Sequence, residues 1–190
     1  MMIKDDSATA SLLDLKAQHW RGTPSPELPE KWEPGQPKTF YVFADERRNY
    51  SGVFLTKDHL YRFSFKEIHD WNDASISAHP ICGWGTGPFS WWQQLARALG
   101  RTWSASPKHD LMVLLGYIEG SSSRFAFADY LNTDDPKSLV TQGTFQAPDS
   151  GELVAFANDA KLDVFYKNNS GYLMMMIEPL SPASNPSSPL

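Results

Sequence analysis

Short runs of apolar and β-branched residues fill the second half of this chain, and Gly, Asp, Asn and Pro residues separate them. Runs of this length, bounded by turn-forming residues, are typical of β-strands, and they do not alternate with helical segments as a parallel α/β fold requires. The pattern therefore predicts an all-β fold, an antiparallel β-sandwich. The runs span residues 111–118, 123–128, 139–147, 152–158 and 172–180.

Strand signals also occur at residues 39–43 and 53–55, and again where Tyr61, Phe63 and Phe65 alternate with polar residues. Successive side chains of a strand point to opposite faces, so a period of two marks a strand with one buried face. We expect these three aromatic rings to lie in the core.

One short helix is predicted within this domain, near residues 90–100. Ser90 is suited to accept hydrogen bonds from the backbone of the first turn. Trp91, Leu95 and Leu99 follow at the spacing that places side chains on one face of a helix. We expect this apolar face to cover one end or edge of a sheet.

The two ends of the chain differ in composition from this domain. Residues 1–37 form a predicted N-terminal arm, in which residues 7–19 favour a short helix and five prolines mark a linker. Residues 38–180 form the predicted β-sandwich domain. Residues 181–190 hold three prolines and four serines with little apolar mass, so we expect a disordered tail.

Composition argues against several kinds of partner. The formal net charge of -5 and the pI near 5.5 argue against a nucleic-acid interface, which needs an excess of Lys and Arg on one face. No run approaches the roughly 20 apolar residues of a membrane span, and no signal-peptide pattern begins the chain. We therefore expect a cytoplasmic protein, unless export uses a route without a cleavable signal.

Signatures of catalysis are missing from the sequence. It contains no Gly-x-Ser-x-Gly elbow and no zinc-binding spacing of histidines. Cys82 is the single cysteine, which rules out an intrachain disulfide, and we expect it to be an inert buried thiol. Asp159 and Asp163 are a pair of acids of the kind that glycosidases use, but no substrate cleft is indicated. We expect that the protein is not an enzyme.

Five tryptophans lie within the predicted domain. Their flat rings suit stacking against the C–H faces of a sugar, and they suit the filling of a core equally well. Core filling is the interpretation that we favour for them. The residues are Trp71, Trp84, Trp91, Trp92 and Trp103.

Carboxylates and carboxamides gather between the last two strand-like runs. Asn158 and Asp159 follow one run, and Asn168 and Asn169 begin the next after a loop of about eight residues. We expect these two polar groups to converge in space. Their oxygen atoms suit a hard divalent cation such as calcium, which takes roughly six to eight oxygen ligands.

Each half of this region also has a purely structural interpretation. Asn158 and Asp159 are suited to an Asx turn, in which the side chain caps its own backbone. Residues 168–171 are suited to a hairpin turn, because Asn and Gly accept left-handed backbone conformations at little cost. The sequence leaves these alternatives open beside the cation site.

This region resembles the binding site of a lectin family. The resemblance rests on Asn158-Asp159, Tyr166 and Asn168-Asn169-Ser170-Gly171. This family is the soluble calcium-dependent galactose-binding lectins of bacteria, of the PA-I galactophilic type. The resemblance is clearest over roughly residues 110–178 and implies a β-sandwich of the jelly-roll, galactose-binding-domain-like type. The loop between the two motifs is longer here than in the lectins.

The resemblance implies a calcium ion whose coordination two sugar hydroxyls complete. Its protein ligands would be the side chains of Asp159, Asn168 and Asn169 and the backbone carbonyl of Phe165. The same three side chains would hydrogen-bond the sugar.

Two further residues are predicted to contact the sugar. The lectins reach the exocyclic hydroxyl of the sugar through a loop centred on His-Pro, and His79-Pro80 occupies a comparable place in this chain. The longer loop also carries a second acid, Asp163, which we expect beside the ligand.

Two functions follow from the sequence. The first is a non-catalytic, lectin-like β-sandwich that recognises galactose-type sugars through calcium. The second is a structural or protein–protein interaction module of a bacterial assembly or effector, in which sugar binding has been lost. In the second, the N-terminal arm would contact a protein partner or a neighbouring copy in a homo-oligomer.

Overall fold

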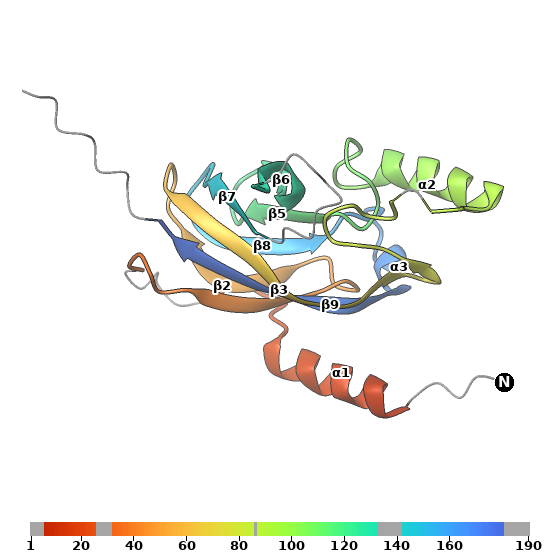
Figure 1. The fold of residues 1–190 in the computed structure, drawn as a ribbon, viewed down its shortest axis with the longest axis horizontal. Coiled ribbons are helices and arrows are strands. Elements are labelled where there is room, and N and C mark those ends of the chain that lie inside the picture. Colours follow the sequence, from red (N-terminus) through yellow and green to blue (C-terminus); the bar gives the residue numbers. More distant parts are fainter. Residues whose placement is uncertain (1–5, 26–31, 86, 133–141, 181–190) are drawn as a thin grey trace, which may run out of the picture.

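The computed structural model describes residues 6–25, 32–85, 87–132 and 142–180. Two antiparallel sheets face each other across a shared core, with the two longer helices outside them (Figure 1). The all-β, antiparallel sandwich predicted from the strand spacing is therefore confirmed.

The first sheet contains five strands. Strands β1, β9, β3 and β4 are adjacent in that order, and β7 pairs with the first half of β3. All of these pairings are antiparallel, and β9 is central because it pairs with both β1 and β3. The bounds are β1 Lys38–Phe43, β3 Leu60–Asp73, β4 Ile76–Ser77, β7 Gln142–Gln146 and β9 Asn169–Pro179.

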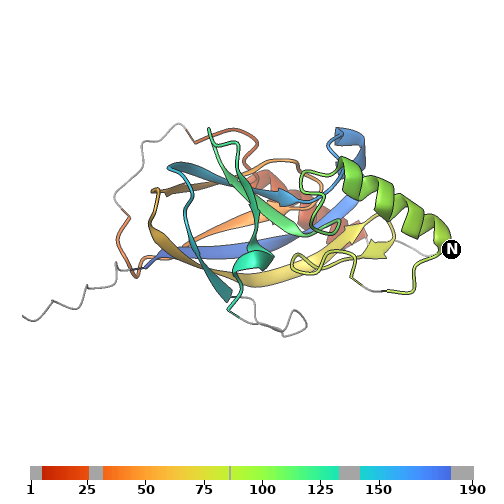
Figure 2. The ribbon, with the colours of Figure 1, turned by 90° about the horizontal axis from the view of Figure 1, so that it is seen from above.

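The second sheet contains four strands in the order β2, β8, β5 and β6. Its central strand β8 runs toward the same end of the sandwich from which β9 starts, as both views of the ribbon show (Figures 1 and 2). The bounds are β2 Asn49–Leu55, β5 Leu114–Ile118, β6 Arg124–Ala126 and β8 Gly151–Ala157.

Aromatic side chains from both sheets fill the core. Tyr61, Phe63 and Phe65 of β3 are buried, whereas Arg62 and Lys66 between and beside them are exposed, so the predicted orientation is confirmed. Burial of such rings is worth about 2 to 3 kcal/mol each, which makes this face of β3 a main source of stability.

Some local predictions are wrong. Residues 111–113 form a turn in which Met112 has a φ of 66°, so the strand begins only at Leu114. The run after β6 continues as the 3-10 helix η1, Phe127–Tyr130. Cys82 is exposed rather than buried. Three predicted segments lie outside the described residues. They are the tail, residues 139–141 of one strand and residues 26–31 of the linker.

The helix predicted near residues 90–100 is α2, Trp91–Trp103. Its orientation differs from the prediction, because none of its residues is buried and it projects beyond the end of the sheets (Figure 1). The core-filling interpretation holds for Trp71 and Trp84 but fails for the three tryptophans on α2, which are 58% to 62% exposed.

Helix α1, Asp6–His19, lies in the arm and is close to the predicted span. Its last turn contacts its own sandwich, because Lys16 Nζ lies 2.6 Å from Asp45 and 2.5 Å from Glu46. Farther along, the backbone N–H of Ser25 donates to the buried carboxylate of Glu152 at 2.7 Å. No helix in the described part is long and apolar enough to cross a membrane.

Candidate binding site at one end of the sandwich

The predicted site lies where β8 ends and β9 begins. Between these strands the chain carries Asn158 and Asp159 and then the short helix α3, Asp163–Tyr166. Because β9 pairs with β3, Asn169 is the register partner of Asp73. The topology therefore brings a third segment, the end of β3, to the two segments found in the sequence.

Two carboxylates and two carboxamides meet at this point, and we call Asp73, Asp159, Asn168 and Asn169 the carboxylate–amide cluster. Asn169 Nδ2 donates to Asp159 Oδ2 at 2.9 Å. Asn168 Nδ2 donates to Asp73 Oδ1 at 2.7 Å. The structure thus brings Asp159 and Asn169 into direct contact, and it pairs Asn168 with Asp73, which is the register partner of Asn169.

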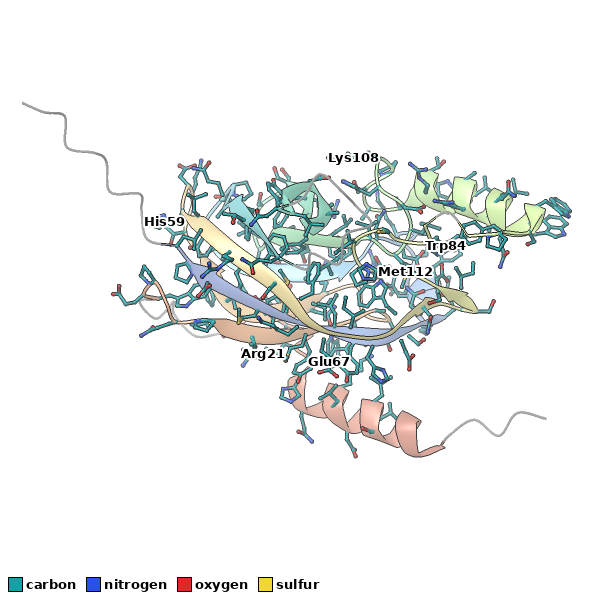
Figure 3. All side chains as sticks on the ribbon, viewed as in Figure 1. Arg21, His59, Glu67, Trp84, Lys108 and Met112 are labelled. Carbon is teal, nitrogen blue, oxygen red and sulfur yellow. The ribbon has the colours of Figure 1, made fainter. Side chains whose placement is uncertain are left out.

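The remaining carboxylate oxygens of the cluster also accept hydrogen bonds. Asp159 Oδ1 accepts from the backbone N–H of Ala160 at 2.6 Å, and Asp73 Oδ2 accepts from Trp84 Nε1 at 3.2 Å. Figure 3 labels Trp84 at the same end of the sandwich as α2. The hydrogen bonds from Trp84 and Asn168 hold the Asp73 carboxylate in place.

The two carboxylates of the cluster are buried, and no cationic side chain among the residues that the structure describes is bound to them. Asp73 and Asp159 are 7% and 3% exposed, and no Lys, Arg or His in the described ranges forms an ion pair with either. Burial, followed by the charge of Asp159, raises the pKa of Asp73 to about 6. Burial also raises the pKa of Asp159. Two buried anions side by side favour the approach of a cation.

One atom of the cluster lacks a partner. Asn169 is 6% exposed, and its Oδ1 makes no hydrogen bond although its Nδ2 bonds both Asp159 and Ala44. A buried carbonyl oxygen without a partner costs about 1 to 3 kcal/mol. Asn168, in contrast, is exposed and forms the solvent side of the cluster.

The donor set fits a hard cation. A rotation about χ2 of an Asn side chain exchanges the positions of Oδ1 and Nδ2. With both amides turned so that Oδ1 points inward, the two carboxylates and two carboxamides present only oxygen atoms to an ion. The unpartnered Oδ1 of Asn169 would then gain a partner. In the described ranges no three His, Cys, Asp or Glu residues form a metal-binding group, so the amides are essential to any such site.

Asn158 has a structural role that differs from the predicted Asx turn. The side chain is fully buried, and its Oδ1 accepts from the backbone N–H of Ser106 at 3.0 Å. Its Nδ2 donates to the carbonyls of Ser106, His109 and Asp110. Asn158 therefore holds the loop after α2 against the end of β8, and the Asx-turn alternative is wrong for this residue.

The hairpin-turn alternative for residues 168–171 is also wrong. Asn169, Ser170 and Gly171 belong to β9, and Ser170 is the register partner of Asn72 on β3. Gly171 has a φ of 93°, and an added Cβ would lie 2.0 Å from the carbonyl oxygen of Asp70. Glycine is required here because β3 and β9 approach closely beside a register shift.

The other predicted site residues lie outside the cluster. Asp163 forms an ion pair with Arg47 at 2.7 Å and its side chain is 76% exposed. Phe165 lies in α3 and is 37% exposed. The carbonyls of the last turn of a helix have no partner within the helix. His79 closes a small loop through two backbone hydrogen bonds with Gly83. Their roles as ligands stay predictions.

Sequence reasoning missed Asp73 as a member of the cluster. The segment Trp71-Asn72-Asp73 stands out as a polar and aromatic loop signal, but nothing local connects it to Asn168. That contact depends on the pairing of β3 with β9, across a separation of 95 residues. Only the tertiary structure supplies this pairing.

Among solved structures, one described as "EclA N-terminal domain; PllA-like lectin" is similar to this chain. The TM-score is 0.46 at 12% sequence identity, and the alignment covers 75% of this chain and 96% of that chain. A likeness at this level concerns the fold alone. No family model and no curated protein sequence matches the chain.

Proposed function

We propose that this chain is a non-catalytic, lectin-like β-sandwich that binds galactose-type sugars through a calcium ion. The observation that carries the proposal is the contact between Asp159 and Asn169 in a buried cluster where Asn169 Oδ1 has no partner. The side chains of Asp159, Asn168 and Asn169 would hold the ion. The backbone carbonyl of Phe165 is a further proposed ligand.

Electrostatics supports a cation at this position. The charged forms of Asp73 and Asp159 are disfavoured by burial, and a divalent cation offsets that cost more fully than neutral amide donors do. Calcium accepts additional oxygen ligands, so a bound ion supplies positions at which two sugar hydroxyls coordinate. Asp73 lies beside Asn168 and would balance the charge of the ion from a second side.

The cluster reaches solvent through Asn168, which suits the approach of a small polar ligand. Asn168 is the exposed member and Asn169 and Asp159 lie beneath it, so a ligand would approach from the Asn168 side. His79 is proposed to contact the sugar from its own loop. A sugar contact by Asp163 would first require its ion pair with Arg47 to open.

Calcium titration of the chelator-treated chain tests the metal half of the proposal. A ligand that binds only the folded state raises the melting temperature, so we expect a rise in millimolar calcium. Asp159→Asn should abolish this rise because it removes a proposed anionic ligand. Asp149→Asn is the matched control, since it removes a partly exposed carboxylate before β8, at the opposite end of that strand.

Titration with galactose at saturating calcium tests the sugar half, with glucose as the comparison. We expect heat of binding with galactose, and loss of that heat in Asp159→Asn or in excess chelator. A rise in melting temperature with calcium but no heat of binding with galactose would refute sugar recognition and would still support the metal site. The absence of both would favour the interaction-module interpretation, which the exposed apolar side of α2 independently supports.

A further inference from the structure

Helix α2 carries its polar side toward the protein and its apolar side toward solvent. Arg97 forms a bidentate ion pair with Asp110. Its Nε donates to Oδ1 at 2.8 Å and its Nη2 donates to Oδ2. Arg101 donates to the carbonyl of Pro107 at 3.3 Å. Gly100 faces the body as well, because an added Cβ would lie 2.9 Å from Leu111 Cδ1.

The opposite side of the helix forms an apolar arc. Its three tryptophans are 58% to 62% exposed and its two leucines are 45% and 49% exposed. A surface helix normally buries such a face, and contiguous exposed apolar surface of this size marks an interaction site. The arc consists of Trp91, Trp92, Leu95, Leu99 and Trp103.

We infer that the apolar arc of α2 is the contact surface for a second copy of this chain, with the two α2 helices packed antiparallel. Trp91, Leu95, Leu99 and Trp103 follow one another at every fourth residue, so the order of side chains is the same from either end. A two-fold axis near the middle of the helix therefore places Trp opposite Trp and Leu opposite Leu.

The exposed area agrees with a weak but specific dimer. A tryptophan side chain offers about 250 Å² at most, so the observed exposures leave roughly 150 Å² on each. With the two leucines the arc offers roughly 600 Å² per copy, or about 1,200 Å² for two, which is the lower limit of specific interfaces. Figure 1 shows that α2 projects beyond the end of the sheets, away from the body of the sandwich.

Charge favours a second copy over a lipid surface. The arc itself contains no ionisable residue, so two arcs meet without like-charge repulsion. Both arginines of α2 are engaged with the body of the protein and are turned away from the arc. Neither arginine is therefore placed to contact anionic headgroups, to which helices at a membrane surface bind through Lys and Arg.

Sedimentation velocity of the full chain over a concentration series up to about 100 µM tests the dimer. We expect the mass to rise toward twice the 21.4 kDa of one chain at high concentration. Leu95→Arg, or Leu99→Arg as a second variant, should leave a folded monomer. Gln94→Arg adds the same charge at the neighbouring exposed position outside the arc, and it should keep the dimer.

Crosslinking tests the antiparallel arrangement. In a Cys82→Ser background, a mixture of Leu95→Cys and Leu99→Cys chains should form a disulfide between unlike chains far more than either variant alone. A preference for like chains would overturn the antiparallel packing.

Several outcomes would overturn the dimer itself: a monomer at every concentration, a dimer that Leu95→Arg leaves intact, or a monomer that cosediments with phosphatidylglycerol vesicles. None of these outcomes tests the proposed calcium site. The calcium titration measures the melting temperature, and it can be carried out equally on the monomeric variants.

Discussion

Asn169 Nδ2 lies 2.9 Å from Asp159 Oδ2, although the two residues stand on opposite sides of a loop that leaves and re-enters the sandwich. The contact forms because β8 ends and β9 starts at the same end of the molecule. It places one carboxylate against one carboxamide whose own oxygen has no partner. Predictions about this end of the protein follow from the groups that surround the pair.

Asp73 should make stability depend on pH. Its pKa is raised from 3.8 to about 6, so the folded protein binds more protons than the unfolded chain between these values. The contribution of Asp73 to stability is therefore full below pH 4 and is lost as the pH rises through about 6. Between pH 5 and 7 we expect the free energy of unfolding to fall by about 1 kcal/mol more in the wild type than in Asp73→Asn.

Urea unfolding without calcium at these two pH values measures the difference. Asp149→Asn, which removes a partly exposed carboxylate outside the cluster, should keep the pH dependence of the wild type. A steeper fall in Asp73→Asn than in the wild type would contradict the assignment.

Asn158→Ala should destabilise the protein strongly. The side chain is fully buried and makes hydrogen bonds with three carbonyls and one backbone N–H. Alanine removes all of these hydrogen bonds at a fully buried position, and we expect about 3 kcal/mol or more of lost stability. Chemical denaturation measures this loss, and Asn72→Ala serves as control, because Asn72 Nδ2 makes one exposed hydrogen bond to Asp70. A loss below about 1 kcal/mol for Asn158→Ala would contradict its role in holding the loop.

Gly171→Ala should be far more harmful than Gly120→Ala. Both glycines have positive φ, 93° and 86°, so alanine is strained at either position by about 1 kcal/mol. At Gly171 the new Cβ also meets the carbonyl oxygen of Asp70 at 2.0 Å, whereas nothing lies within 4 Å at Gly120. We expect an additional loss of about 2 kcal/mol or more, because β3 and β9 must separate.

Melting temperatures of the two glycine variants provide the comparison. Because the separation of β3 from β9 moves Asp73 away from Asn169, Gly171→Ala should also lose the calcium response. Equal melting temperatures for both variants would show that the strands do not approach as closely as described.

Asp163→Asn should leave the calcium response unchanged. The carboxylate is exposed, and its pKa is lowered by the hydrogen bond from Arg47 and by the charge of that residue. Its partner lies on the β1–β2 connection rather than in the carboxylate–amide cluster. Calcium titration of Asp163→Asn beside the wild type checks this, and a weakened response would bring Asp163 into the metal site.

Local pattern in the sequence was sufficient for the fold class. Strand lengths, turn residues and the alternation at Tyr61, Phe63 and Phe65 depend on near neighbours in the chain, so they predict strands and their buried faces. The capping residue Ser90 and the spacing of Leu95 and Leu99 likewise predict helix α2. The convergence of Asp159 with Asn169 was also accessible, because one short connection separates them.

Tertiary structure alone decided two features. Asp73 joins the cluster through the register of β3 against β9, and no local signal encodes a pairing of residues so far apart in the chain. The amphipathic pattern of α2 shows which residues share a face, but the ion pair of Arg97 with Asp110 decides that the polar face turns inward. Periodicity in the sequence shows which residues share a face of one helix or strand. Strand register and helix orientation depend instead on contacts between elements that lie far apart in the chain and meet only on folding.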